Sequence, residues 1–229
     1  MARRIFSIRY FSYPGEAPQV ILAIDTTSEY GSMALVDESG ALVAELPIRS
    51  SDGFSHVLYG HLRSFLDAHA LRLSDIYCFA CAGGPGSFTG VRVGMAAVKG
   101  LAEATGKPAT AVSNLQALAC FGRLPLRATL LDARRGEIFG AVYDDALEIV
   151  SPEVVMKLDE WLATLPNENI EVISNQTFPG IAVREAPREL AAAIGKIAAQ
   201  RWQRGEEGDP ARLDATYVRR SDAELFWKE

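Results

Sequence analysis

The residues whose types most suggest chemistry stand in GGPGSFTGVRVGMAAVKG, residues 83–100, where an apolar strand leads into a helix. Glycines beside Ser87 and Thr89 at such a junction are typical of loops that hold phosphate on backbone amides. The spacing does not fit a P-loop, because Thr89 takes the sixth position from Gly84 and no lysine follows. Ser87 also lacks the flanking glycines of a nucleophile elbow. We therefore expect neither a phosphate loop nor a catalytic serine.

Histidines and cysteines raise the question of a metal site. His56 and His61 diverge by about 140° around a helix, and His69 lies roughly 12 Å further along it. No HExxH motif is present. Cys78 and Cys81 form a CxxC within an apolar strand, where this spacing sends the two side chains to opposite faces. We expect reduced, buried thiols and no metal.

Two aspartates close apolar strands, as in hairpins that grip the phosphates of a nucleotide. Such a hairpin needs glycine directly after the aspartate, so that backbone amides can approach the phosphate. Here Thr26 and Thr27 follow Asp25, while Arg134 stands two residues after Asp132. These five residues predict a vestigial nucleotide site, and no cofactor is expected. An alternative remains open, in which Asp25 and Asp132 hold a magnesium nucleotide in a small phosphotransferase.

The helix after the opening loop carries an excess of small residues. Gly90 and Gly94 are one pair at helical spacing, and Ala96, Gly100 and Ala104 form a second row. An interior glycine costs about 1 kcal/mol relative to alanine, so close approach by another element should offset it. That element is either the sheet of the same chain or the helix of a partner.

A repeated order of elements positions these residues. The segment LAIDTTSEYGSMALVD matches TLLDARRGEIFGAVYD without gaps, placing Asp25 on Asp132 and Asp37 on Asp144. An internal duplication of a strand-strand-strand-helix-strand-helix unit is characteristic of actin-like proteins. We predict an α/β, actin-like (ASKHA, RNase H-like) fold with a duplicated βββαβα unit and two lobes. Its parts are an extension at residues 1–19, a first lobe at 20–122 and a second lobe with tail at 123–229.

The predicted elements follow the apolar periodicity and the turn residues. In the first lobe Ser55 should cap a helix, and in the second Ser151 and Pro152 should open another. Predicted strands are 20–25, 32–37, 41–48, 77–82, 109–112, 147–150 and 170–174; predicted helices are 55–70, the one ending at Gly106, 115–121 and 187–204.

Composition limits the classes of function. The chain has 229 residues, a net charge of −6 and 48% hydrophobic residues. An acidic chain offers no broad cationic surface to nucleic acid, so RNA contact would need a basic partner. No apolar run approaches the roughly 20 residues of a membrane span, and no secretory signal is evident. A cytoplasmic protein is expected.

The motifs ILAIDTTSEYGSMAL, GGPGSFTGVRVGMAAVKGLA, VSNLQALA and LDARRGEIFGAVYD resemble the TsaB (YeaZ) family, from about residue 20 to the end. The resemblance implies a non-catalytic subunit in tRNA threonylcarbamoyladenosine (t6A) modification. Its partners would be the catalytic paralogue TsaD, as a heterodimer, and the ATPase TsaE. Contact with tRNA would occur only through the complex. The sequence leaves open whether the isolated chain forms a homodimer.

The resemblance also implies a partner interface on the helices that flank the opening loop, formed here by His56, Leu62, Gly90, Gly94, Ala97 and Gly100. Two features depart from the family pattern. Residues 1–19 are an addition, and Ala215 stands where the family tends to have proline before its Tyr-Leu-Arg. A peptidase, the historical label of the wider superfamily, ranks last because Ser87 and the histidines form no catalytic set.

Overall fold

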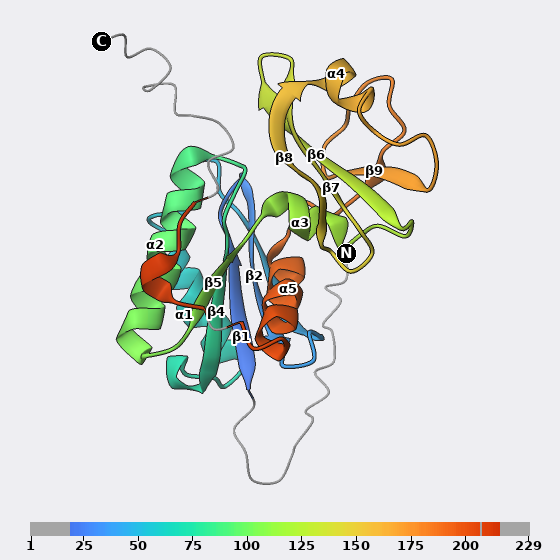
Figure 1. The fold of residues 1–229 in the computed structure, drawn as a ribbon. Coiled ribbons are helices and arrows are strands. Elements are labelled where there is room, and N and C mark those ends of the chain that lie inside the picture. The colour runs from blue at the N-terminus through green and yellow to red at the C-terminus, as the bar shows by residue number, and fades with distance from the viewer. Residues whose placement is uncertain (1–18, 207, 216–229) are drawn as a thin grey trace, which may run out of the picture.

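The computed structural model describes residues 19–206 and 208–215, which fold into two lobes, each built on a five-stranded sheet (Figure 1). The extension at 1–19 lies outside the described residues except for Gln19. The first sheet has the order β3-β2-β1-β4-β5. Its strands are β1 (Val20–Asp25), β2 (Tyr30–Asp37), β3 (Leu42–Arg49), β4 (Ile76–Ala82) and β5 (Ala109–Val112).

The second sheet repeats that order as β8-β7-β6-β9-β10. The predicted duplication and the actin-like, RNase H-like two-lobe fold are therefore confirmed. The matched aspartates also play matched local roles: Asp25 accepts a hydrogen bond from Thr27 N at 2.9 Å, and Asp132 accepts one from Arg134 N at 2.7 Å. The strands are β6 (Leu126–Arg134), β7 (Glu137–Tyr143), β8 (Ile149–Lys157), β9 (Ile170–Ser174) and β10 (Arg184–Glu185).

Helices cover the first sheet on both faces. Helices α1 and α2 lie side by side over one face and share an apolar core with it, whereas α5 covers the other face (Figure 1). Helix α3 belongs to the first half of the chain but packs on β6 and β7, and α5 belongs to the second half but packs on β1 and β2. The two halves therefore exchange helices. The helices are α1 (Leu58–Ala68), α2 (Phe88–Thr105), α3 (Asn114–Ala119), α4 (Leu158–Leu162) and α5 (Ala191–Gln203), with short 3-10 turns η1 (Leu73–Asp75) and η2 (Pro210–Arg212).

Several local predictions can be compared with these elements. Cys78 and Cys81 do enter cores on opposite faces of the first sheet, and Gly106 ends α2 with φ +63°. The helix predicted from Ser151 is wrong, because β8 continues through Pro152. Since β8 is an edge strand, a residue without an N–H is tolerated there.

The predicted cap at Ser55 is also wrong. Helix α1 begins at Leu58, and Val57, whose side chain cannot accept a hydrogen bond, occupies the capping position. Among the described residues, none of the helices is long and apolar enough to cross a lipid bilayer.

Candidate functional site

The opening loop is built as a helix start that rests on the β1–β2 turn. The Ser87 hydroxyl accepts from Gly90 N at 3.3 Å, so Ser87 is the N-cap of α2. Its own amide donates to the Thr27 carbonyl at 2.7 Å. A Cβ on Gly86 would lie only 2.7 Å from the Thr27 Cβ. The glycine and the serine of this loop therefore serve close packing and capping.

Gly90 and Gly94 face the chain's own β1–β2 turn. A Cβ on Gly90 would lie 2.1 Å from the Thr26 carbonyl oxygen, and one on Gly94 would lie 2.6 Å from Thr26 Oγ1. Ala97 and Leu62 are 3% and 4% exposed and belong to the core between α1, α2 and the sheet. The expectation that these four residues form a partner interface is corrected: Gly90 and Gly94 pack against Thr26, and the Ala97 and Leu62 side chains are buried within this chain.

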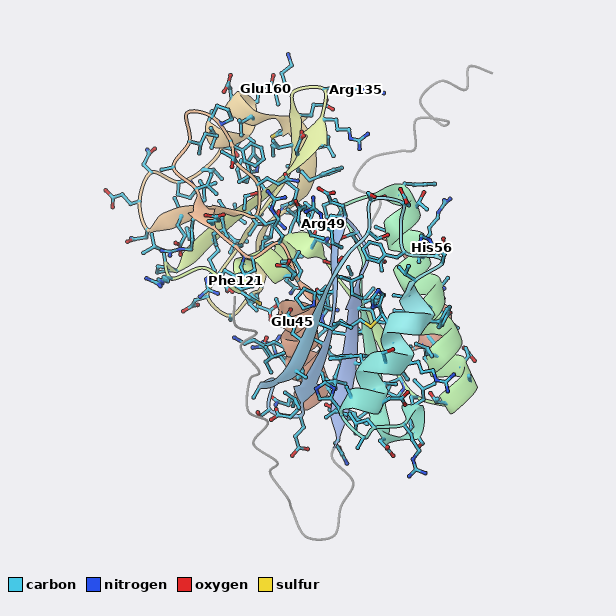
Figure 2. The ribbon with its side chains drawn as sticks, turned by 180° about the vertical axis from the view of Figure 1, so that it is seen from behind. Glu45, Arg49, His56, Phe121, Arg135 and Glu160 are labelled. Atoms are coloured by element: carbon cyan, nitrogen blue, oxygen red, sulfur yellow. The ribbon has the colours of Figure 1, made fainter. Side chains whose placement is uncertain are left out.

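Gly100 and His56, the two remaining predicted interface residues, lie at the surface. A Cβ on Gly100 would have no atom of the described chain within 4 Å, and the α2 row that contains it is exposed. Figure 2 shows His56 at the α1 side of the first lobe. The sequence spacing therefore identified an exposed row of small residues that contains Gly100. Gly90 and Gly94 belong to a different row of α2, which is buried.

Two large apolar side chains missed by the sequence reasoning are also exposed on α1 and α2. Tyr59 on α1 is 58% exposed and Phe88 at the start of α2 is 47% exposed. The Arg92 guanidinium lies 3.6 Å from the centre of the Phe88 ring. Tyr59 lies only about 20° around the helix from buried Leu66, so periodicity alone could not show that it is exposed. The outer face, as we define it, consists of Tyr59, Phe88, Ala96, Gly100 and Ala104.

Asp25 of the predicted nucleotide site is buried and bound by its own chain. It is 2% exposed, and its Oδ1 accepts from the Thr27 amide at 2.9 Å and the Thr27 hydroxyl at 2.6 Å. The Thr27 hydroxyl oxygen in turn accepts from Asn114 Nδ2 at 2.6 Å. Burial raises the pKa of the Asp25 carboxyl, while hydrogen bonds from Thr27 and Leu190 oppose that shift.

The same aspartate anchors the helix that returns from the second half of the chain. The first amides of α5 have no partner within the helix and must be satisfied elsewhere. Leu190 N donates to Asp25, and Ala191 N donates to Ser32 Oγ at 3.1 Å. Ala192 N donates to Glu45, which lies on the α5 side of the first lobe (Figure 2). One acceptor from each of β1, β2 and β3 thus fixes α5 on the first sheet.

Asp132 and Arg134 lie apart from this buried cluster. Both are exposed near the tip of the β6–β7 hairpin, where Figure 2 shows the neighbouring Arg135 at the far end of the second lobe. Asp132 N donates to Gln176 Oε1 at 2.7 Å, and Arg134 adopts φ +65°. Within the described residues, no hydrogen bond joins Asp132 to Asp25. The five residues predicted as a nucleotide site are therefore split into a buried set and an exposed pair.

The three histidines do not form a cluster. His69 Nδ1 lies 2.7 Å from the Phe65 carbonyl oxygen, and its ring packs edge-on against the Phe65 ring. In the described part of the chain, no three His, Cys, Asp or Glu residues are grouped so as to hold a metal ion. Burial raises the pKa of Cys78 and of Cys81 to about 12, which keeps both thiols protonated.

These features define a class of protein with two lobes of actin-like, RNase H-like architecture. The aspartate at the end of its first strand makes hydrogen bonds within the chain. A family model described as TsaD, tRNA N6-adenosine threonylcarbamoyltransferase, matches residues 45–201. The tRNA threonylcarbamoyladenosine biosynthesis protein TsaB of Bacillus subtilis is 30% identical over 91% of this chain and 98% of its own length. The chain belongs to the TsaB family.

Two further relatives agree with that assignment. The TsaB protein of Escherichia coli is 29% identical, and the match covers 91% of this chain and 97% of the relative. The solved structure of YeaZ from Pseudomonas aeruginosa has a TM-score of 0.74 and 25% identity, covering 87% of this chain and 99% of that one.

Proposed function

We propose that this protein is a non-catalytic subunit of the tRNA t6A modification machinery, which binds a TsaD-like catalytic subunit through the outer face. Membership of the TsaB family supports the pathway, because the Bacillus and Escherichia relatives are named for tRNA threonylcarbamoyladenosine biosynthesis.

The observation that carries the proposal is a contrast between two parts of the first lobe. A nucleotide-binding relative would need the carboxylate of Asp25. Here that carboxylate already accepts hydrogen bonds from Thr27 and from the start of α5. The outer face, in contrast, exposes Tyr59 of α1 and Phe88 of α2, and α2 also carries a row of exposed small residues whose backbone a second helix could approach closely. A chain built in this way is suited to binding a partner rather than to phosphoryl transfer.

The remaining partners follow from the charge and the pathway. A TsaE-like ATPase would join the assembled pair, and tRNA would be contacted only through the complex, because a net charge of −6 disfavours independent RNA binding. The protein would work in the cytoplasm. In the absence of TsaD, two copies would pair through the same outer face.

Co-purification with a TsaD-like protein tests the proposal, using Gly100→Leu and Tyr59→Ala as interface variants. Both changes lie at exposed positions, so folding should be retained while the complex is lost and t6A formation fails. Ile149→Ala is the matched control, because Ile149 is 62% exposed but belongs to the second lobe. If both interface variants bind the partner as well as the control does, docking through the outer face is wrong.

A further inference from the structure

We infer that Asn114 is a positioning residue for the partner-binding end of α2, although it lies on neither the outer face nor α2. The inference rests on the proposed docking through that face. Asn114 is the first residue of α3, is 3% exposed, and its amide donates to the Gly84 carbonyl at 2.7 Å. Its backbone therefore holds the loop that leads into α2.

The side chain of Asn114 holds the β1–β2 turn. The Thr27 hydroxyl gives its hydrogen to Asp25 Oδ1 at 2.6 Å, so its oxygen must accept from Asn114 Nδ2, which lies 2.6 Å away. This order fixes the orientation of the amide group. Asn114 Oδ1 is buried and has no hydrogen-bond partner in the part of the chain that the structure describes. The amino group alone therefore accounts for the bond to the turn.

The β1–β2 turn also supports the first eight residues or so of α2. Thr26 Oγ1 donates to the Gly90 carbonyl at 2.7 Å, and the Thr27 carbonyl accepts from Ser87 N at 2.7 Å. Gly90 and Gly94 lie so close to Thr26 that a shift of the turn must move the helix or open the contact. Phe88, one of the two large apolar residues of the outer face, is the first residue of this helix.

Asn114 also stands at a junction between the lobes. The preceding Ser113 hydroxyl donates to the Glu153 carboxylate on β8 of the second sheet, and that carboxylate also accepts from Tyr143 Oη at 3.0 Å. Successive residues at the start of α3 thus bond to the second lobe and to the turn beneath α2. The place of Phe88 is set relative to both lobes through this junction.

Two measurements on Asn114→Ala test the inference: amide hydrogen exchange of residues 88–95, and the dissociation constant for the TsaD-like partner. Loss of one buried hydrogen bond should speed that exchange on the order of tenfold, and should weaken the partner complex by a similar factor. Gln116→Ala is the matched control. It lies on the same helix and removes the bond to the Leu147 carbonyl at 3.0 Å and the bond from Arg201 Nη2 at 2.9 Å, both away from the β1–β2 turn.

A double-mutant cycle isolates the contact between Asn114 and Thr27. Thr27→Val also removes the hydroxyl donation to Asp25, so its effect should exceed that of Asn114→Ala, whereas adding Asn114→Ala to Thr27→Val should change little further. Thr27→Ser keeps the hydroxyl and should behave like wild type. If Asn114→Ala does not fold, the comparison of Thr27→Val with Thr27→Ser tests the same contact from the other side. Unchanged exchange at 88–95, or an equal change in Gln116→Ala, overturns the inference. If Gly100→Leu and Tyr59→Ala still bind the partner, the proposed docking fails, while the exchange result still judges Asn114.

Discussion

Alanine substitutions at Gly94 and Gly100 should have opposite effects on stability, although both positions lie inside α2. At Gly100 no atom of the described chain, apart from its chain neighbours and the nearby backbone of α2, lies within 4 Å of the new Cβ, so only the backbone contribution remains. Alanine is favoured over glycine in a helix interior by up to about 1 kcal/mol. Gly100→Ala should therefore stabilise the protein by up to that amount.

At Gly94 the new methyl group would lie 2.6 Å from Thr26 Oγ1. That oxygen donates to the Gly90 carbonyl at 2.7 Å, so moving it away breaks a buried hydrogen bond. Overpacking costs about 1–3 kcal/mol, and the lost bond adds about 1 kcal/mol. After the gain in helix propensity, Gly94→Ala should destabilise the protein by about 1–3 kcal/mol.

Thermal unfolding followed by circular dichroism separates the two cases. About 1 kcal/mol shifts the midpoint by about 2–4 °C in a chain of this size, so the two variants should differ by about 4–16 °C. Gly90→Ala should fall with Gly94→Ala, because its Cβ would lie 2.1 Å from the rigid Thr26 carbonyl. Equal midpoints for Gly94→Ala and Gly100→Ala would refute the division of α2 into a buried and an exposed small-residue row.

Three further outcomes are expected. Calorimetric titration with Mg-ATP should show weak binding at most, and the protein should have no ATPase activity, because the Asp25 carboxylate is already hydrogen-bonded to Thr27. Micromolar binding that is abolished by Asp25→Ala would contradict this. Because burial holds the folded-state pKa of Asp25 above its ordinary 3.8, the folded state binds the extra proton, so this group's stabilising contribution is lost as pH rises through the folded pKa. Denaturant midpoints of Asp25→Asn across pH should therefore lack that part of the wild-type slope, and parallel curves would refute the assignment. Cys78 and Cys81 should react with a thiol reagent only on unfolding, since burial raises each pKa to about 12; rapid labelling of the native protein would disagree.

The sequence predicted the central strands of the first sheet well because their apolar runs are continuous and buried. Val20–Asp25 is buried along its whole length, and Cys78 and Cys81 separate to the two faces as strand geometry requires. Where a local signal had two structural uses, it failed. Ser151 and Pro152 suit a helix start, but they also suit the edge strand β8, and only the pairing partner β7 decides between the two.

The candidate site was harder to predict because its decisive contacts join distant parts of the chain. Ser32 and Ala191 are separated by 159 positions, and Thr27 and Asn114 by 87. Glycine spacing showed that α2 must approach another element closely, but spacing cannot say whether that element is Thr26 or a partner. The buried row proved to be internal, whereas the row containing Gly100 is exposed.

Thr26 and Thr27 explain both the lack of a phosphate-binding turn and the fixed position of α2. A phosphate-gripping turn needs glycine after its aspartate, and this chain has Thr26 and Thr27 there. The Thr26 hydroxyl bonds to Gly90 of α2, and the Thr27 hydroxyl joins Asp25 to Asn114. Glycines at these two positions would remove the hydroxyl bonds that tie the turn to Gly90, Asp25 and Asn114, so α2 would keep only the backbone bond from Ser87 N to the carbonyl of residue 27. We therefore expect Thr26→Gly with Thr27→Gly to weaken partner binding without restoring ATP hydrolysis, because Leu190 N still occupies Asp25 and Asp132 remains exposed on the other sheet. Normal partner affinity in that double variant would show that the threonines do not support α2.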